Sequence, residues 1–155
     1  MRQSFRLSVN GTVREVEVDP QTSLLHALRN QLGLTGARFG CGQALCGACF
    51  VLVDDVVVPS CDTPMWSVDG KRVVTVEGLG DDEDLHRVQE AVLEHQAAQC
   101  GYCISGMIMT AEAFLRTNPS PDEAAIRQAL ATNLCRCGTH VRIIRAVQLA
   151  ARSAS

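Results

Sequence analysis

Eight cysteines are the residues of this 155-residue chain best suited to chemistry. A reducing cytosol disfavours four structural disulfides. Four thiolates are instead the number that a tetrahedral zinc site or an iron–sulfur cluster takes. The cysteines fall into two such groups of four: Cys41, Cys46, Cys49 and Cys61, then Cys100, Cys103, Cys135 and Cys137. The sequence therefore predicts two metal centres.

The first group has the spacing C-x4-C-x2-C, followed by eleven residues and a fourth cysteine. This spacing is typical of plant-type [2Fe–2S] ferredoxins. Gly40, Gly42 and Gly47 allow the loop to wrap a cluster closely, adopt unusual φ/ψ values and turn backbone N–H groups toward the sulfurs. Zinc is the alternative, but zinc ligands usually come as two close pairs from separate turns, whereas here three cysteines crowd one loop. The spacing therefore favours a [2Fe–2S] cluster.

The second group begins with "QCGYC", a C-x-x-C directly ahead of a predicted helix. This pattern fits a redox dithiol of the thioredoxin kind, whose thiol pKa is lowered at a helix start, and equally half of a metal site. A thioredoxin-type site needs a preceding βαβ unit, whereas this segment follows a predicted helix and opens a bundle. We therefore expect "NLCRCG" to complete the site, although the spacing alone leaves zinc open as the metal.

Two predicted helices explain how the second group comes together. Residues 104–117 and 122–132 are expected to form an antiparallel hairpin, which brings the segment before the first helix to the segment after the second. The helix that starts after Cys103 also points the positive end of its dipole toward the thiolates. The four thiols are therefore expected at one end of a bundle.

The first half of the chain is predicted to be a small β-rich domain. The Asn-Gly pair at 10–11 between alternating apolar residues predicts a type I′ hairpin, and the Asp-Asp pair at 54–55 turns a second one. Between them, Ser23 offers an N-cap hydroxyl to the helix "LLHALRNQL", which Gly33 ends. Strands are expected within residues 4–9, 12–18, 50–61 and 71–77.

The second half is predicted to be helical, because its apolar residues recur with a helical period. Ser120 is expected to cap the third helix, with Pro121 at the first helical position. The expected helices cover residues 85–98, 104–117, 122–132 and 140–151. The predicted fold class is thus α+β, with one domain at residues 1–77, a linker at 78–84 and a helical domain at 85–155.

Composition excludes several classes of protein. The net charge of −3 argues against a nucleic-acid partner, which usually needs a basic face. No window has the apolar length of a membrane span, and the first residues lack the apolar segment of a secretory signal. We therefore expect a cytoplasmic chain with no membrane span.

Taken together, "FGCGQALCGAC", "QCGYCISGM" and "NLCRCG" resemble the small iron–sulfur subunit of the molybdenum hydroxylases, the xanthine dehydrogenase and aldehyde oxidase family. The resemblance covers nearly the whole chain. Within the family, "AAQCGYC", "GMIMTAEAFL" and "NLCRCGTHVRIIRAV" are most similar to small subunits of two-component nicotinate and isoquinoline dehydrogenases.

The resemblance implies a β-grasp ferredoxin-like domain followed by a four-helix domain, each with one [2Fe–2S] cluster. Cys41, Cys46, Cys49 and Cys61 would hold the N-terminal cluster; Cys100, Cys103, Cys135 and Cys137 would hold the other. A large partner subunit would carry the molybdopterin cofactor, which Gln99 and Cys137 would approach by hydrogen bonding. This chain would need no catalytic acid, base or nucleophile of its own.

By the same resemblance, electrons leave the molybdenum through the C-terminal cluster, then the N-terminal cluster, to a flavin subunit or a cytochrome. The substrate would be an N-heteroaromatic compound such as nicotinate or an isoquinoline. An aldehyde or purine oxidoreductase with a flavin subunit is the alternative within the family. A free-standing two-cluster electron carrier and a zinc-stabilised interaction module are the alternatives outside it.

Two positions depart from the family pattern: Ala44 replaces a common glycine, and Ile104-Ser105 replaces the usual Thr-Pro. Neither change removes a ligand, although alanine tolerates positive φ poorly and the loop is expected to differ slightly there. The chain's histidines, His26, His86, His95 and His140, have no carboxylate partner nearby in sequence and are expected at the surface or in caps. Only His140, close to Cys137, is a candidate for adjusting a cluster.

Overall fold

The computed structural model describes residues 1–81 and 83–153, so position 82 of the expected linker and residues 154–155 lie outside it. The N-terminal half is built on a five-stranded sheet with the order β2-β1-β5-β3-β4. β1 and β5 run parallel, and the other neighbouring pairs are antiparallel. The strands are β1 (Gln3–Val9), β2 (Thr12–Val18), β3 (Phe50–Val53), β4 (Val56–Pro59) and β5 (Arg72–Val74).

Both predicted hairpin turns are present. Their central residues have positive φ, 49° and 77° at Asn10 and Gly11, and 49° and 68° at Asp54 and Asp55. β5 is shorter than expected, because the Asn10 side chain bonds both the amide and the hydroxyl of Thr75 and the chain then turns into a 3-10 segment, η3 (Val76–Gly78).

The predicted first helix is present in two parts. α1 (Leu24–His26) begins with the Ser23 hydroxyl accepting the His26 amide, as expected, and continues as a π-helical segment, η1 (Ala27–Gln31). Apolar periodicity does not distinguish these two hydrogen-bonding patterns. A 3-10 segment, η2 (Met65–Val68), follows the second hairpin and contributes Met65 and Val68 to the core under the sheet.

In the part of the C-terminal half that the structure describes there are four helices: α2 (Arg87–Glu94), α3 (Ile104–Thr117), α4 (Glu123–Ala129) and α5 (His140–Arg152). α2 ends earlier than expected because Gln96 takes a left-handed φ of 46°. The predicted start of α4 is wrong: Asp122, and not Ser120, is the N-cap, and its carboxylate accepts the Ala125 amide at 2.7 Å. The α+β class is confirmed.

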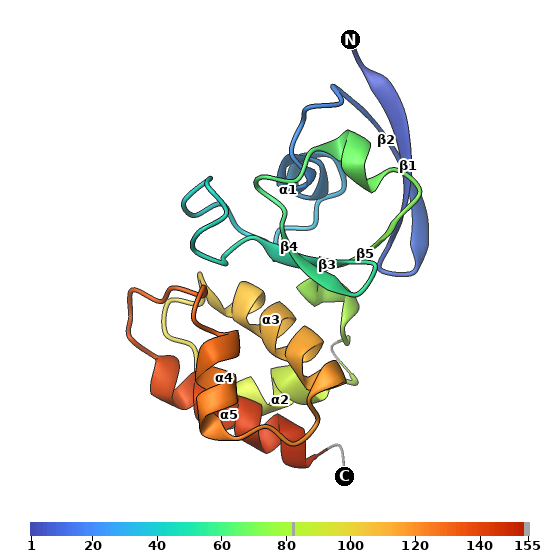
Figure 1. The fold of residues 1–155 in the computed structure, drawn as a ribbon. Helices are drawn as coiled ribbons and strands as arrows, with labels where there is room; N and C mark the ends of the chain where they lie inside the picture. The colour runs from blue at the N-terminus through green and yellow to red at the C-terminus, as the bar shows by residue number, and fades with distance from the viewer. Residues whose placement is uncertain (82, 154–155) are drawn as a thin grey trace.

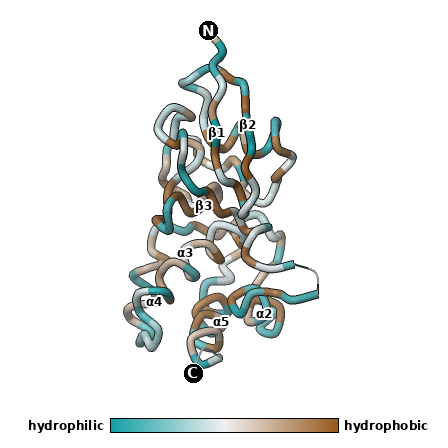
Figure 2. Tube along the Cα trace, turned by 90° about the vertical axis from the view of Figure 1, so that its right-hand side faces the viewer, coloured by the Kyte–Doolittle hydropathy of each residue, from teal (hydrophilic) through white to brown (hydrophobic). Residues whose placement is uncertain are grey.

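The two halves have separate apolar cores, one beneath the sheet and one among the helices. They meet where α3 packs along β3 and β4 (Figure 1). β3 is buried along its whole length, lies between β5 and β4 in the sheet, and appears as a hydrophobic segment above α3 (Figure 2). Among the residues described, no helix is long and apolar enough to cross a membrane.

Candidate iron–sulfur centres

The loop before β3 turns backbone amides toward its own thiols. The amides of Gln43 and Leu45 donate to Cys41 Sγ at 3.4 and 3.3 Å, and the Cys41 amide donates to Cys46 Sγ at 3.4 Å. The first two of these bonds lower the pKa of the Cys41 thiol to about 7. The loop is therefore shaped to stabilise negative charge on sulfur, which thiolate ligands carry.

Glycines make this loop possible in two different ways. Gly42 and Gly47 have positive φ, 68° and 77°, as the sequence predicted. Gly40 does not; a Cβ there would lie 2.6 Å from Cys46 Sγ, so its role is to let that sulfur approach the backbone. Ala44 also takes positive φ, 60°, so the loop accepts the strain of an alanine at that position and keeps its amides directed at Cys41.

The β3–β4 hairpin brings the other two thiols of the first group together. Cys49 precedes β3 and Cys61 follows β4, and the two strands pair antiparallel from Phe50 opposite Pro59. The Ser60 hydroxyl donates to the Cys49 carbonyl at 2.6 Å and closes the end of the hairpin. Cys49 and Cys61 lie within hydrogen-bonding reach of each other, and burial raises the pKa of the Cys49 thiol to about 12.

The second group assembles at the start of α3, as the predicted helical hairpin requires. Cys103 meets Cys135, and Cys100 meets Cys137. Burial, together with the neighbouring Cys135, raises the pKa of Cys103 to about 12. Burial also raises the pKa of Cys135, but hydrogen bonds from the hydroxyl and amide of Thr139, from Cys103 and from the Cys137 amide together outweigh it and bring that pKa to about 6. Cys103 therefore keeps the proton of this pair while Cys135 is the readier thiolate.

The sequence did not identify Thr139 as part of this site. Its hydroxyl lies 3.3 Å from Cys135 Sγ, and the residue is buried at the start of α5. A threonine four residues after a predicted ligand carries no signal by itself. His140, the one histidine singled out, bonds the Asn133 carbonyl at 3.1 Å through Nε2.

The two groups face one another across the boundary between the halves. The Leu134 amide donates to the Cys46 carbonyl at 2.9 Å, which joins the two cysteine loops directly. The Tyr102 hydroxyl donates to the Phe39 carbonyl, and Arg38 donates to the Gly101 carbonyl. A cavity of about 460 Å³ lies between the loops and is lined by thiols of both groups: Cys41 and Cys46, and Cys100, Cys103 and Cys135.

These thiols fit two-iron clusters better than single ions. Within residues 1–81 and 83–153, no three Cys, His, Asp or Glu side chains converge as ligands of one ion. The thiols lie in pairs, Cys41 with Cys46, Cys49 with Cys61, Cys103 with Cys135 and Cys100 with Cys137. A [2Fe–2S] cluster takes two protein ligands on each iron. The buried Asn133 amide at the loop junction also has no hydrogen-bond partner among the described residues.

Comparisons with known proteins agree with this arrangement. A family profile described as "2Fe-2S iron-sulfur cluster binding domain" matches residues 7–79, and one described as "[2Fe-2S] binding domain" matches residues 75–148. The chain is 50% identical to a nicotinate dehydrogenase subunit of Pseudomonas putida, covering 99% of this chain and 98% of that relative. It is 46% identical to the alpha subunit of isoquinoline 1-oxidoreductase from Brevundimonas diminuta, covering 92% and 93% of the two chains.

Solved structures show the same fold. A chain of quinoline 2-oxidoreductase from Pseudomonas putida superposes with a TM-score of 0.94 at 37% identity, covering 99% of this chain and 96% of that one. The aldehyde oxidoreductase of Desulfovibrio desulfuricans superposes with a TM-score of 0.95 at 39% identity, but this chain covers only 17% of that longer protein. The same two-part unit thus occurs both inside a long chain and as a chain of its own.

Two matched cluster-binding domains and close similarity to small subunits over the whole chain lead to one assignment. The chain belongs to the molybdenum hydroxylase family, as an electron-transfer subunit with two [2Fe–2S] clusters that works beside a larger molybdopterin-binding subunit.

Proposed function

We propose that each group of four cysteines ligates one cluster. The pairing of the thiols supports this assignment, because Cys49 meets Cys61 and Cys103 meets Cys135, within their own groups. The N-terminal ligands would be Cys41, Cys46, Cys49 and Cys61, and the C-terminal ligands Cys100, Cys103, Cys135 and Cys137. Each bound cluster would carry one electron at a time.

The single observation that best supports electron transfer between the groups is the hydrogen bond from the Leu134 amide to the Cys46 carbonyl. Cys46 is a proposed ligand of one cluster, and Leu134 precedes the proposed ligand Cys135 of the other. The bond gives a short connection through backbone atoms from one ligand set to the other. The chain's own part is to hold these loops in contact.

We further propose that the second group faces the molybdopterin cofactor of the large subunit. Gln99 is exposed and adjoins Cys100, whose thiol meets that of Cys137. An exposed carboxamide beside two thiols at the surface suits hydrogen bonding to a pterin held by another chain. Electrons would then enter at Cys100 and Cys137 and leave from the Cys41 loop.

We infer an N-heteroaromatic substrate for the complex, because relatives of matching length are named for nicotinate, isoquinoline and quinoline. An aldehyde is the second candidate, supported by the aldehyde oxidoreductase structures. The final acceptor would be a cytochrome or a flavin subunit. The acceptor can be identified from the further subunit that co-purifies with the complex, because haem-binding C-x-x-C-H motifs in its sequence mark a cytochrome.

We also propose domain limits of 1–77 and 85–155, with a linker at 78–84. The fully buried residues form two separate apolar cores, one ending at Val73 and one starting at Val88, and this supports the division; Val76 and Leu79, near the boundary, pack against the second core. A cytoplasmic location is proposed as well, because eight unpaired thiols fit a reducing compartment.

Cysteine substitution tests the ligand assignment. Replacing Cys135 with serine should remove one of two iron–sulfur EPR signals and about half of the iron, whereas replacing Cys61 should remove the other signal. A Cys135 variant that keeps both signals would contradict the assignment. So would wild-type protein holding about two zinc ions and no iron, since zinc takes four thiolates per ion.

A further inference from the structure

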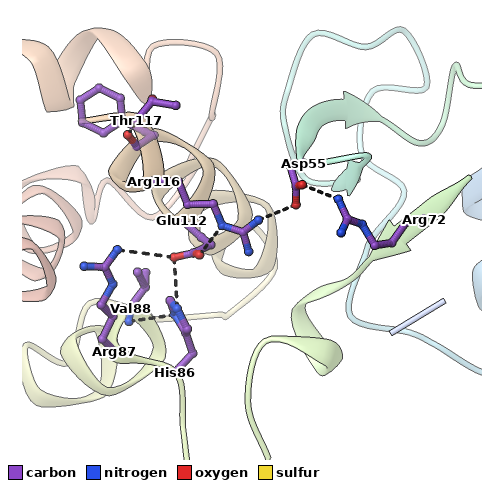
Figure 3. A network of polar contacts seen from close by, with 9 residues as sticks. Asp55, Arg72, His86, Arg87, Val88, Glu112, Arg116 and Thr117 are labelled. Carbon is purple, nitrogen blue, oxygen red and sulfur yellow. Dashed lines mark hydrogen bonds and ion pairs between the residues drawn. The ribbon is translucent and has the colours of Figure 1, made fainter. Parts of the chain in front are cut away.

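A chain of charged side chains connects the two halves near the end of α3 and the β3–β4 turn (Figure 3). Arg116, near the end of α3, donates from Nε to Glu112 Oε1 at 2.7 Å and from Nη1 to Asp55 Oδ1 at 2.6 Å. Asp55 lies in the β3–β4 turn and also binds Arg72 of β5. Arg116 therefore joins its own helix to the sheet of the other half.

Glu112 anchors this contact from inside the helical half. It is only 4% exposed, so its charge requires partners. Oε1 receives Arg116, and Oε2 faces His86 Nε2 at 3.1 Å and Arg87 at 4.0 Å. The His86 contact has the distance of a hydrogen bond without its alignment, and burial lowers the pKa of His86, so the arginines are the charged partners of Glu112. With these partners, Glu112 fixes the direction of the Arg116 guanidinium.

Asp55 is an unfavourable residue for its turn unless its carboxylate is used. Its φ is 68°, and the second position of a type I′ turn is usually glycine. Aspartate adopts this conformation at some cost, whereas glycine adopts it freely. What aspartate adds is a carboxylate that meets Arg116 from α3 and Arg72 from β5.

The Asp55–Arg116 contact holds α3 at a second point, well separated from its first close contact with the other half. Near the start of the helix, Gly106 lies so close to the Gly47 carbonyl that a Cβ would overlap it. Arg116 is ten residues further on, about 15 Å along the helix axis. α3 starts directly after Cys103, and β3 starts directly after Cys49. A helix held at one point can pivot, whereas a helix held at two points keeps its angle.

We propose that the Asp55–Arg116 contact is a positioning device that fixes the angle of α3 on β3 and thereby the relative orientation of the two cysteine groups. Arg116 is a positioning residue, acting on electron transfer only through this geometry. The proposal rests on the cluster assignment proposed above, and the experiment below separates the two.

The test uses the full chain, loaded with clusters and in complex with its large subunit, and compares Asp55→Asn and Arg116→Gln with wild type. Asp55→Asn removes the charge but introduces asparagine, which tolerates positive φ, and it leaves the Glu112–Arg116 pair intact. Both EPR signals should persist, but the magnetic interaction between the two reduced clusters should change. Amide exchange in the β3–β4 turn should become about two- to fivefold faster.

Arg127→Gln is the matched control. It removes a similar arginine–glutamate pair, at 2.6 Å to Glu123, whose two residues both belong to α4. The double variant Asp55→Asn/Arg116→Gln should match the Arg116 variant in magnetic interaction, because the same contact is lost in both. If the Asp55 and Arg116 variants behave as Arg127→Gln does, the positioning proposal fails. If either EPR signal is missing from wild type, the cluster assignment fails instead.

Discussion

The Leu134 amide donates to the carbonyl of Cys46, 88 positions earlier in the chain, and so ties the two cysteine loops together at 2.9 Å. Leu134 itself exposes 61% of its surface, so its backbone matters here more than its side chain. Replacing Leu134 with proline removes the donor and should cost about 1 kcal/mol of unfolding free energy. It should also slow electron transfer between the clusters. The measurement reduces one cluster rapidly and follows the rate at which its electron passes to the other. Leu134→Ala keeps the amide and should transfer electrons at the wild-type rate; equal rates in both variants would show that the bond is irrelevant.

Replacing Ala44 with glycine is expected to stabilise the chain. Ala44 has a φ of 60°, a conformation that costs an L-residue about 1–2 kcal/mol and glycine little. Part of this gain is lost to the greater entropy of glycine in the unfolded chain, so a net gain of about 0.5–1 kcal/mol is expected in thermal or urea unfolding. Ala131→Gly, at an exposed position without positive φ, should instead be neutral or destabilising. If Ala44→Gly lowered the free energy of unfolding, the positive φ of Ala44 would not be a source of strain.

Gly106 should tolerate no side chain. A Cβ there would overlap the Gly47 carbonyl, which belongs to the backbone of the cysteine loop and has no alternative rotamer. Gly106→Ala should therefore destabilise the chain by about 1–3 kcal/mol, even though alanine is the better helix former. Cluster content after purification and urea unfolding report the effect. Ser105→Ala, in the same turn and without added volume, is the control, and a Gly106→Ala chain as stable as that control would argue against close packing.

His86 should make stability depend on pH. Its Nδ1 accepts the Val88 amide as the N-cap of α2, which requires an unprotonated nitrogen. Burial holds the pKa of His86 below its ordinary 6.5, and this outweighs the opposite effect of Glu112. Because the unfolded chain binds the proton more readily, the contribution of His86 is complete above about pH 6.5 and is lost as the pH falls through the folded value.

Comparing wild type with His86→Asn isolates this contribution. Asparagine can still cap a helix but does not titrate in this range. The difference in unfolding free energy between the two proteins should be constant above about pH 6.5 and should shrink below it. If the difference does not vary between pH 7 and pH 5, or grows on acidification, His86 does not have a lowered pKa in the folded chain.

The local features of this fold could be predicted from sequence because each depends on neighbouring residues. The spacing from Cys41 to Cys49, the Asn10-Gly11 turn and the Ser23 cap are of this kind, and the structure contains the predicted loop, hairpin and helix start. The start of α4 was mispredicted because Ser120 and Asp122 are both good caps, and only the structure shows which one accepts an amide.

The contacts between the two halves could not be predicted, because their partners lie far apart in sequence. Gly106 meets the carbonyl of Gly47, and Arg116 meets Asp55. His86 was expected at the surface or in a cap; it is the N-cap of α2, and the structure also places Glu112, distant in sequence, beside it. Periodicity and spacing describe one segment at a time and carry no information on such pairs.

The crowding at Gly47 also limits how such proteins can be recombined. A Cβ on this residue would overlap the Asn133 amide, while its carbonyl already touches Gly106, so one residue of the first half is enclosed by two segments of the second. The sequence predicts two domains joined by a linker, yet at this junction the surfaces of the two halves are in close contact. A graft of the helical half from a relative therefore needs matching small residues at this junction. Substitutions on one side of the junction are expected to require compensating substitutions on the other.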